Sequence, residues 1–279
     1  MISLIVCSRR NHVPQALRDN VAQTIGDTPF EWIVIDNSKN LYNIFQAYNE
    51  GIRLAKGDIL CFMHDDVLFH SKDWGKMVGD CFESYPKLGC LGVAGSHLML
   101  DLPSSYWHSE TFCLHCYCKD ETGTPVLIED ARYKNDNGLT QVASVDGLWM
   151  CLRRSLFDTI RFDDQTFKGF HCYDSDICMQ VIQAGFDIGV TFEVAVEHSK
   201  SGPLDATYFE NIHLWYDKWK GFLPLSRGAE FTEDDIATRT ALVRHIVTLE
   251  NHVADLQRVY DSKAYRLGRV FLGKFKRKA

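Results

Sequence analysis

The stretch GDILCFMHDDV (residues 57–67) joins a short apolar run to an abrupt polar end. The run at residues 59–63 is too short for a convincing helix and follows a glycine, so it predicts a buried strand. His64, Asp65 and Asp66 come directly after it. Adjacent carboxylates resist joint ionisation unless positive charge lies nearby, and their hard oxygens suit Mg²⁺ or Mn²⁺. The stretch therefore predicts either a cation site or an ordinary acidic turn, where Asp is common.

The segments before this stretch alternate between strand and helix. Apolar runs predict strands over residues 3–7 and 31–35, and apolar residues at four-residue spacing predict helices over residues 13–25 and 44–55. With the strand at 59–63, the order is β-α-β-α-β, which is typical of a parallel sheet with crossover helices. We therefore expect an α/β fold of Rossmann-like type, with a sheet flanked by helices.

Polar residues follow each of these three strands. In open parallel sheets, ligands bind beyond the carboxyl ends of the strands. Ser8 and Arg9 follow the first strand, Asp36 follows the second and residues 64–66 follow the third, so these side chains should share one rim. Carboxylates on such a rim can bond a ribose hydroxyl. No G-x-G-x-x-G follows the first strand and no G-x-x-x-x-G-K-[ST] occurs, which disfavours a dinucleotide fold and a P-loop.

Composition narrows the class of protein. The 279 residues are 46% hydrophobic, enough for a sizeable core, and the net charge of -7 argues against nucleic-acid binding. No apolar run reaches about 18 residues, so no transmembrane helix is expected. The short apolar start is followed by Arg9 and Arg10, which favours a first strand over a signal peptide. These features predict a cytoplasmic protein.

The ten cysteines favour a reducing compartment over a disulfide framework, because no export signal is recognised. One group stands apart, formed by Cys113, His115, Cys116 and Cys118. A zinc site usually needs two spaced ligand pairs, and only one compact group is present. Zinc and a cysteine-rich strand both stay open here.

The C-terminal part, residues 226–279, changes character. Its apolar positions alternate spacings of four and three, which is a heptad pattern: Leu242, Ile246, Leu249, Val253, Leu256 and Tyr260. The pattern lasts about three heptads, so a coiled coil that joins two copies and a helix packed on its own domain are both open. We expect a domain over residues 1–225 and a helical extension over 226–279.

The tail of this extension, residues 262–279, carries seven Lys or Arg residues and no acid, with apolar residues interleaved. A basic amphipathic segment on an acidic protein is typical of a peripheral contact with a membrane surface, here at its inner face. A solvated terminus is the alternative.

In their order, these landmarks resemble the family 2 nucleotide-sugar glycosyltransferases, over about residues 2–202. Residues 48–60, YNEGIRLAKGDIL, are similar to that family's "N-x-G … A-x-G-x-x-I" run, which leads into its DxD-type motif. Here the motif reads His64-Asp65-Asp66, with His where the family more often has Asp. Residues 172–177, CYDSDI, are similar to the family's G-E-D-x-D-L helix start, with Tyr173 in place of Glu.

The resemblance implies a GT-A fold with a C-terminal helical extension. It implies a metal-dependent, inverting enzyme of hexosyltransferase type that moves a sugar from a nucleoside-diphosphate donor, with UDP-sugars favoured, to an acceptor hydroxyl. It places Asp174 at the catalytic-base position, and Asp66 and His198 on Mn²⁺ or Mg²⁺, with His64 as a further candidate ligand. The donor nucleotide would contact Ser8, Arg9, Asp36, Asn49 and Asp65. The donor sugar or acceptor would contact Asp146, Gly147, Trp149 and Asp176. The acceptor would be a glycan or a lipid-linked glycan in surface polysaccharide synthesis.

Two other classes stay open. A sugar nucleotidyltransferase should have a glycine-rich phosphate loop after the first strand, and residues 8–11 contain basic residues but no glycine. A binding or scaffold protein on a degenerate transferase fold would explain the departures at His64 and Tyr173. Donor hydrolysis by the purified protein separates this scaffold from an enzyme.

Overall fold

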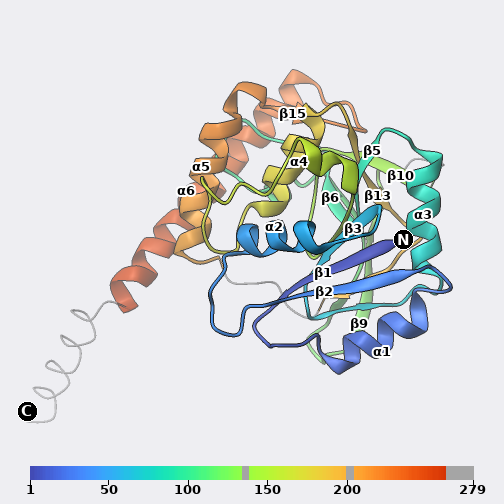
Figure 1. Cartoon of the computed structure of the whole chain (residues 1–279). Helices are drawn as coiled ribbons and strands as arrows, with labels where there is room; N and C mark the ends of the chain where they lie inside the picture. Colours follow the sequence, from blue (N-terminus) through green and yellow to red (C-terminus); the bar gives the residue numbers. More distant parts are fainter. Residues whose placement is uncertain (134–137, 199–203, 262–279) are drawn as a thin grey trace, which may run out of the picture.

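The computed structural model describes residues 1–133, 138–198 and 204–261, in which two sheets are flanked by helices (Figure 1). The larger sheet has the strand order β10-β13-β5-β12-β3-β1-β2. Its strands are β1 Ile2–Ser8, β2 Phe30–Asp36, β3 Ile59–Met63, β5 Leu88–Gly92, β10 Leu139–Val142, β12 Trp149–Arg153 and β13 Asp187–Thr191.

The first three strands pair in parallel as the sequence predicts, with β1 in the middle. The apolar run at residues 149–153 forms β12, which lies antiparallel between β3 and β5. This inserted strand makes the sheet mixed. Because β12 arrives from the opposite direction, the loop before it lies at the same edge as the carboxyl ends of β1 and β3.

Short segments spread between residues 67 and 198 build a second, smaller sheet. Its strands are β4 Val67–Phe69, β6 Ala94–Ser96, β8 Phe112–Lys119, β11 Ser144–Val145 and β14 Val196–His198, with β9 Pro125–Asp130 paired to β8. A separate pair joins β7 Leu98–Met99 to β15 Leu225–Ser226. In the register of β14 and β4, His198 faces Val67, which brings it beside the polar end of β3.

The helices divide between two core layers. They are α1 Gln15–Thr24, α2 Ile44–Leu54, α3 Trp74–Ser84, α4 Tyr173–Gln183, α5 Ala206–Trp219 and α6 Glu233–Asp261, with short 3-10 helices η1 Tyr106–Ser109, η2 Arg154–Asp158 and η3 Lys220–Phe222. Alternate residues of β1 point to opposite faces: Ile5 packs with α2 and α4, and Leu4 packs with α1 and α3. Gly51 permits the contact of α2 with β1, because a Cβ there would come 2.4 Å from the Ile5 side chain.

The cysteine group does not gather into a zinc site. The pleat of β8 puts Cys113 and Cys116 on opposite faces, in different core clusters. Within the described ranges, the one cluster of metal-ligating side chains is elsewhere, at His64, Asp66 and His198. The cysteine-rich strand is therefore the correct alternative.

The long helix α6 packs on the domain through its first half. Val243 is buried against Leu98, Leu100 and Leu102, while the last turns project beyond the domain (Figure 1). The basic tail predicted to contact a membrane, residues 262–279, lies outside the described residues. Among the described helices, none combines the length and apolar character needed to cross a membrane.

Candidate active site

The carboxyl ends of β1, β2 and β3 form a polar rim. Ser8 and Asp36 are neighbours in the parallel register, and the Ser8 hydroxyl donates to the Asp65 carboxylate at 2.5 Å. Arg9 is exposed next to Ser8, and Asp36 is exposed at the end of β2. The structure thus brings together four of the five residues expected at the donor nucleotide.

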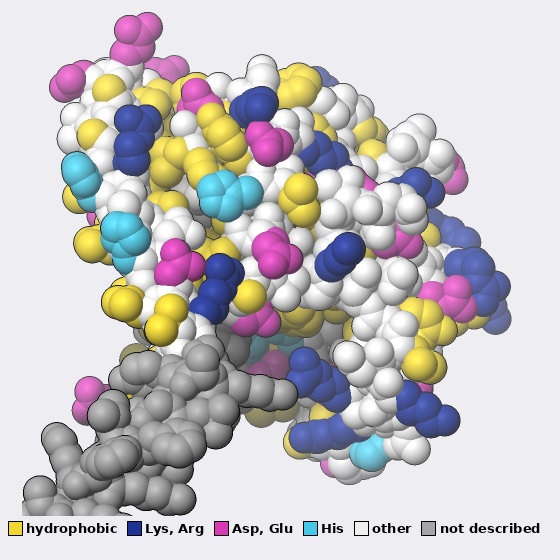
Figure 2. All heavy atoms as spheres, turned by 90° about the vertical axis from the view of Figure 1, so that its left-hand side faces the viewer, with side chains coloured by type: hydrophobic (Ala, Val, Ile, Leu, Met, Phe, Trp, Pro, Cys, Tyr) yellow, Lys and Arg dark blue, Asp and Glu magenta, His cyan; other side chains and the backbone are white. Residues whose placement is uncertain are grey.

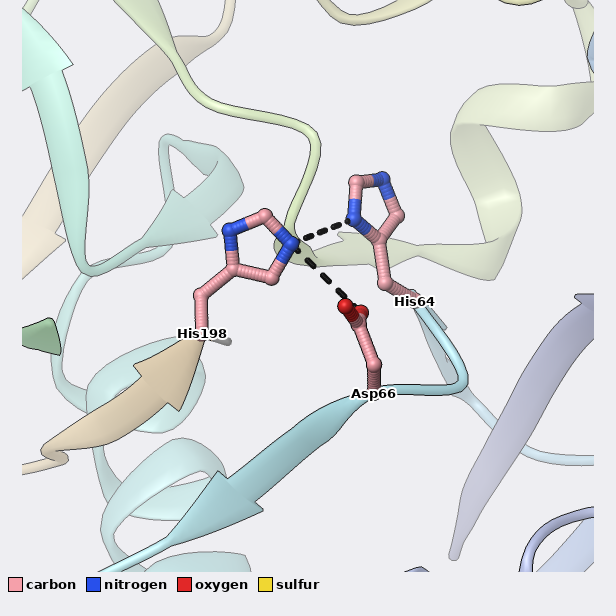
Figure 3. A group of neighbouring side chains, drawn as sticks. All are labelled: His64, Asp66 and His198. Atoms are coloured by element: carbon pink, nitrogen blue, oxygen red, sulfur yellow. Dashed lines mark hydrogen bonds and ion pairs between the residues drawn. The ribbon is translucent and has the colours of Figure 1, made fainter. Parts of the chain in front are cut away.

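Three side chains converge behind this rim, from the end of β3, the start of β4 and the end of β14 (Figure 3). His64 Nδ1 lies 3.1 Å from His198 Nε2, and that same nitrogen lies 3.4 Å from a carboxylate oxygen of Asp66. One ligand atom from each residue lies within 4.8 Å of the others. Burial opposes charge on His198, but the hydrogen bond and charge of Asp66 outweigh it and raise the pKa of the imidazole.

This cluster fits a divalent cation. The two facing imidazole nitrogens cannot both carry a proton at 3.1 Å, whereas one cation can accept both lone pairs. His64 Nε2 lies 2.8 Å from the Tyr173 hydroxyl, an outer hydrogen bond that fixes the ring as metal-ligating histidines require. Two imidazoles and one carboxylate together suit a divalent cation that accepts both nitrogen and oxygen ligands.

Asp174 is held at the first turn of α4 by backbone donors. Its oxygens accept the Gly147 N–H at 3.0 Å and the Ser175 N–H at 2.7 Å. The preceding Cys172 has a left-handed backbone with φ of 69°, which turns the chain into the helix. Burial, together with the charge of Asp146, raises the pKa of Asp174 to about 7. A carboxyl group that titrates near neutral pH is suited to proton transfer.

Asp146 and Gly147 support this carboxylate from the loop before β12. Asp146 accepts hydrogen bonds from the Tyr106 hydroxyl and from the Leu148 N–H, the latter at 2.8 Å. A Cβ on Gly147 would come 2.2 Å from the Tyr173 hydroxyl oxygen. Glycine is therefore required for Tyr173 to reach His64.

One cavity of about 460 Å³ joins the two histidines of the cluster to Asp146 and Asp174. His64, His198, Asp146 and Asp174 line its polar side. The other wall is aromatic, with Trp107 and Tyr208 stacked at 6.0 Å between ring centroids. Sequence reasoning did not assign the residues of this wall, which are Tyr106, Trp107, Phe170, His171 and Tyr208. Residues 205–222 are rich in Tyr and Trp, a signal that could have identified Tyr208, whereas no periodic pattern in the sequence marks η1.

Three residues expected at the site contact other parts of the protein instead. Trp149 is fully buried and packs edge-on against Trp74 and Phe69 in the core. The Asn49 amide exchanges two hydrogen bonds with the Phe162 backbone, so it anchors a loop to α2. Asp176 points the other way from Asp174 on α4 and is buried. Trp149, Asn49 and Asp176 therefore have structural roles, and their expected contacts with donor or acceptor are corrected. The sequence does not reveal these roles, because burial depends on packing partners distant in sequence.

The buried carboxylate of Asp176 pairs with Lys218, whose partly exposed ammonium also lies 2.7 Å from Asp163. The Lys218 ammonium lies 2.8 Å from the buried carboxylate, which also accepts bonds from the Trp219 indole at 2.8 Å and from Gln180 at 2.7 Å. Lys218→Met should lower the free energy of unfolding by about 3 kcal/mol at pH 7, since it leaves a buried carboxylate unpaired. Burial already raises the pKa of Asp176, so the loss should shrink as the pH falls and the group is protonated.

Urea denaturation at pH 7 and pH 5 measures this effect. Lys220→Met is the matched control, because Lys220 pairs with Asp217 at the surface and such pairs contribute about 1 kcal/mol or less. Equal stability of the two variants at pH 7 would contradict the role given to Lys218.

A mixed α/β sheet with this rim and metal-ligating cluster defines the GT-A class of glycosyltransferase folds. The chain belongs to the family described as "Glycosyltransferase like family", whose model matches residues 18–212. No curated protein matches the chain.

Solved structures share this fold at low sequence identity. GalNAc-T7 with UDP, GalNAc and Mn²⁺ is 12% identical with a TM-score of 0.53, and the match covers 78% of this chain and 49% of that one. TarS 1-349 of S. aureus in complex with UDP-GlcNAc is 12% identical with a TM-score of 0.50, over 87% of this chain and 71% of that one. The chain thus spans about half of the GalNAc-T7 chain.

Proposed function

We propose that this protein transfers a sugar from a nucleoside-diphosphate donor to an acceptor hydroxyl, with inversion at the anomeric carbon. The observation that carries the proposal is one cavity that joins a carboxyl group with a pKa near 7 to a metal-ligating cluster. A bound Mn²⁺ would offset the charge that develops on the departing diphosphate. His64, Asp66 and His198 would hold that ion.

Asp174 is the base in this proposal. It takes the proton of the acceptor hydroxyl as the oxygen bonds the anomeric carbon and the bond to the diphosphate breaks. Attack from the face opposite the leaving group inverts the configuration. The hydrogen bonds from Gly147 and Ser175 keep the carboxylate oriented without neutralising it.

The donor nucleotide would lie along the rim at Ser8, Arg9, Asp36 and Asp65. UDP-sugars are the first donors to test, because the GalNAc-T7 complex contains UDP and the TarS complex contains UDP-GlcNAc. The acceptor would lie against the aromatic wall, where Trp107 and Tyr208 offer apolar ring faces and the Asp174 carboxylate is near.

The acceptor in this proposal is a glycan or a lipid-linked glycan, as in surface polysaccharide synthesis. The basic sequence of residues 262–279 supports a site of action at the inner face of a membrane. The competing function is that of a scaffold that binds a sugar nucleotide without turnover. It stays open because this chain has His64 where the family's motif more often begins with Asp.

Release of UDP by the purified protein with Mn²⁺ tests the proposal. Candidate UDP-, GDP- and dTDP-sugars are first ranked by the rise in melting temperature that each causes, and release is then followed with and without acceptor glycans. Transfer or slow donor hydrolysis supports an enzyme. Binding of a donor with no turnover under any condition would favour the scaffold instead.

The pH dependence of transfer provides a further test. Since the base must be ionised and its pKa is about 7, log(kcat/KM) should rise with a slope of about one up to pH 7 and level off above it. Mn²⁺ is kept at a saturating concentration, so that competition between protons and Mn²⁺ for His198 does not alter the pH profile. A flat profile from pH 5.5 to 8 would contradict the assignment of Asp174.

A further inference from the structure

Helix α6 has two apolar faces, of which the domain covers one. On the covered face, Val243 packs into the cluster of Leu98, Leu100 and Leu102. Arg239 donates to the Ser109 carbonyl at 2.7 Å, and Glu250 lies 3.2 Å from the His108 imidazole. These contacts fix α6 on η1 and β7, from Arg239 to Glu250.

The second face is exposed except at Ile246, which is half-buried. Leu242, Leu249, Val253 and Leu256 expose 54%, 63%, 65% and 70% of their surface. In Figure 2, hydrophobic side chains lie at the surface beside the point where the grey C-terminal segment begins. Single exposed leucines are ordinary, but a stripe of them on one helix is typical of an interaction surface.

The two faces point in different directions. At about 100° per residue, Val253 and Leu249 lie roughly 80° and 120° around the helix from Val243. A second helix can therefore reach the exposed stripe while α6 keeps its contacts with the domain. The packing of α6 on its own domain therefore leaves the coiled-coil alternative open.

We propose that two copies of this chain associate through the exposed stripe as a parallel, two-stranded coiled coil. The heptad a positions are Ile246, Val253 and Tyr260, and the d positions are Leu242, Leu249 and Leu256. Two of the three a residues, Ile246 and Val253, are β-branched, and β-branched residues at a with Leu at d favour two parallel strands. A partner of another kind would not require this division of residue types between a and d.

The flanking positions are compatible with pairing between identical helices. The g positions are His245, His252 and Val259, and the e positions are Val243, Glu250 and Gln257. Across a parallel pair, g faces e of the other helix, so His245 meets Glu250 of the second copy, which also contacts its own chain's His108, and no like charges meet. The dimer does not depend on the proposed function, since none of these residues lines the cavity.

Sedimentation velocity of the full-length chain tests the proposal. The wild type should sediment as a dimer, with twice the chain mass of 32.0 kDa, as its concentration rises to about 100 µM, because three heptads are short and a micromolar Kd is expected. Leu249→Lys combined with Leu256→Lys should be monomeric throughout, with an unchanged melting temperature. Thr248→Lys is the matched control, as it places the same charge at an exposed position off the stripe.

Cross-linking tests the orientation. Leu256→Cys should form a disulfide dimer under mild oxidation, because a parallel pair places the two d residues side by side, while the wild type with its own cysteines reports the background. A monomeric wild type at about 100 µM would overturn the proposal. A dimer that survives both Lys substitutions, a larger assembly, or a Leu256→Cys variant that stays uncross-linked would overturn it as well.

Discussion

Asp174→Asn should reduce sugar transfer by about 1,000-fold, because general-base catalysis contributes roughly 10² to 10⁴ in rate. The amide cannot accept the proton of the acceptor hydroxyl. Donor binding should change little, since the rim at Ser8, Asp36 and Asp65 is untouched. The loss should therefore appear in kcat, with the KM for the donor within a few-fold of the wild type.

A matched variant separates chemistry from folding. Asp217→Asn removes the same charge at an exposed position of α5 and should keep full activity. Circular dichroism and the donor-induced rise in melting temperature report whether Asp174→Asn remains folded and binds donor. If that variant binds donor and keeps more than about a tenth of wild-type transfer, Asp174 is not the base.

His198→Ala should reduce transfer by at least about 100-fold at Mn²⁺ concentrations that saturate the wild type, because a bound cation contributes several kcal/mol of charge stabilisation. His198 Nε2 lies closest to both other candidate ligands, so its loss opens the centre of the cluster. Asp66→Asn should behave alike, and part of the loss in each variant should be recovered at higher Mn²⁺.

Chelation gives an independent measurement of the same site. Treatment with EDTA should abolish transfer, and added Mn²⁺ should restore it. His213→Ala is the control for His198→Ala, because His213 is exposed on α5. Full activity after complete chelation would refute a role for the cation.

The sequence predicts the first three strands and two helices of the fold well because their signals are local. Alternating strands and helices up to residue 63 each have their own periodicity, and parallel pairing follows from the crossovers. The antiparallel insertion of β12 and the second sheet depend on contacts between distant segments. Short strands such as β4 and β14 have too few residues for a period to show.

Some residues of the candidate site can likewise be predicted from the sequence, and others cannot. The place of His64, Asp65 and Asp66 at a strand end marks them as candidates from the residues alone, whereas Asp174 is a candidate base only through the family resemblance. Asn49, Trp149 and Asp176 were misassigned because neighbours distant in sequence bury or engage them. The sequence does not predict the aromatic wall. Part of this wall comes from η1, and no local pattern in the sequence predicts where that segment lies.

A crystal structure with UDP and Mn²⁺ tests the central claim most directly, because one anomalous difference map locates the ion. The account predicts a manganese peak bound by His198 Nε2 and Asp66, with His64 Nδ1 beside it, and a nucleotide along Ser8, Asp36 and Asp65. A manganese peak remote from this cluster, or a nucleotide bound elsewhere, would contradict it.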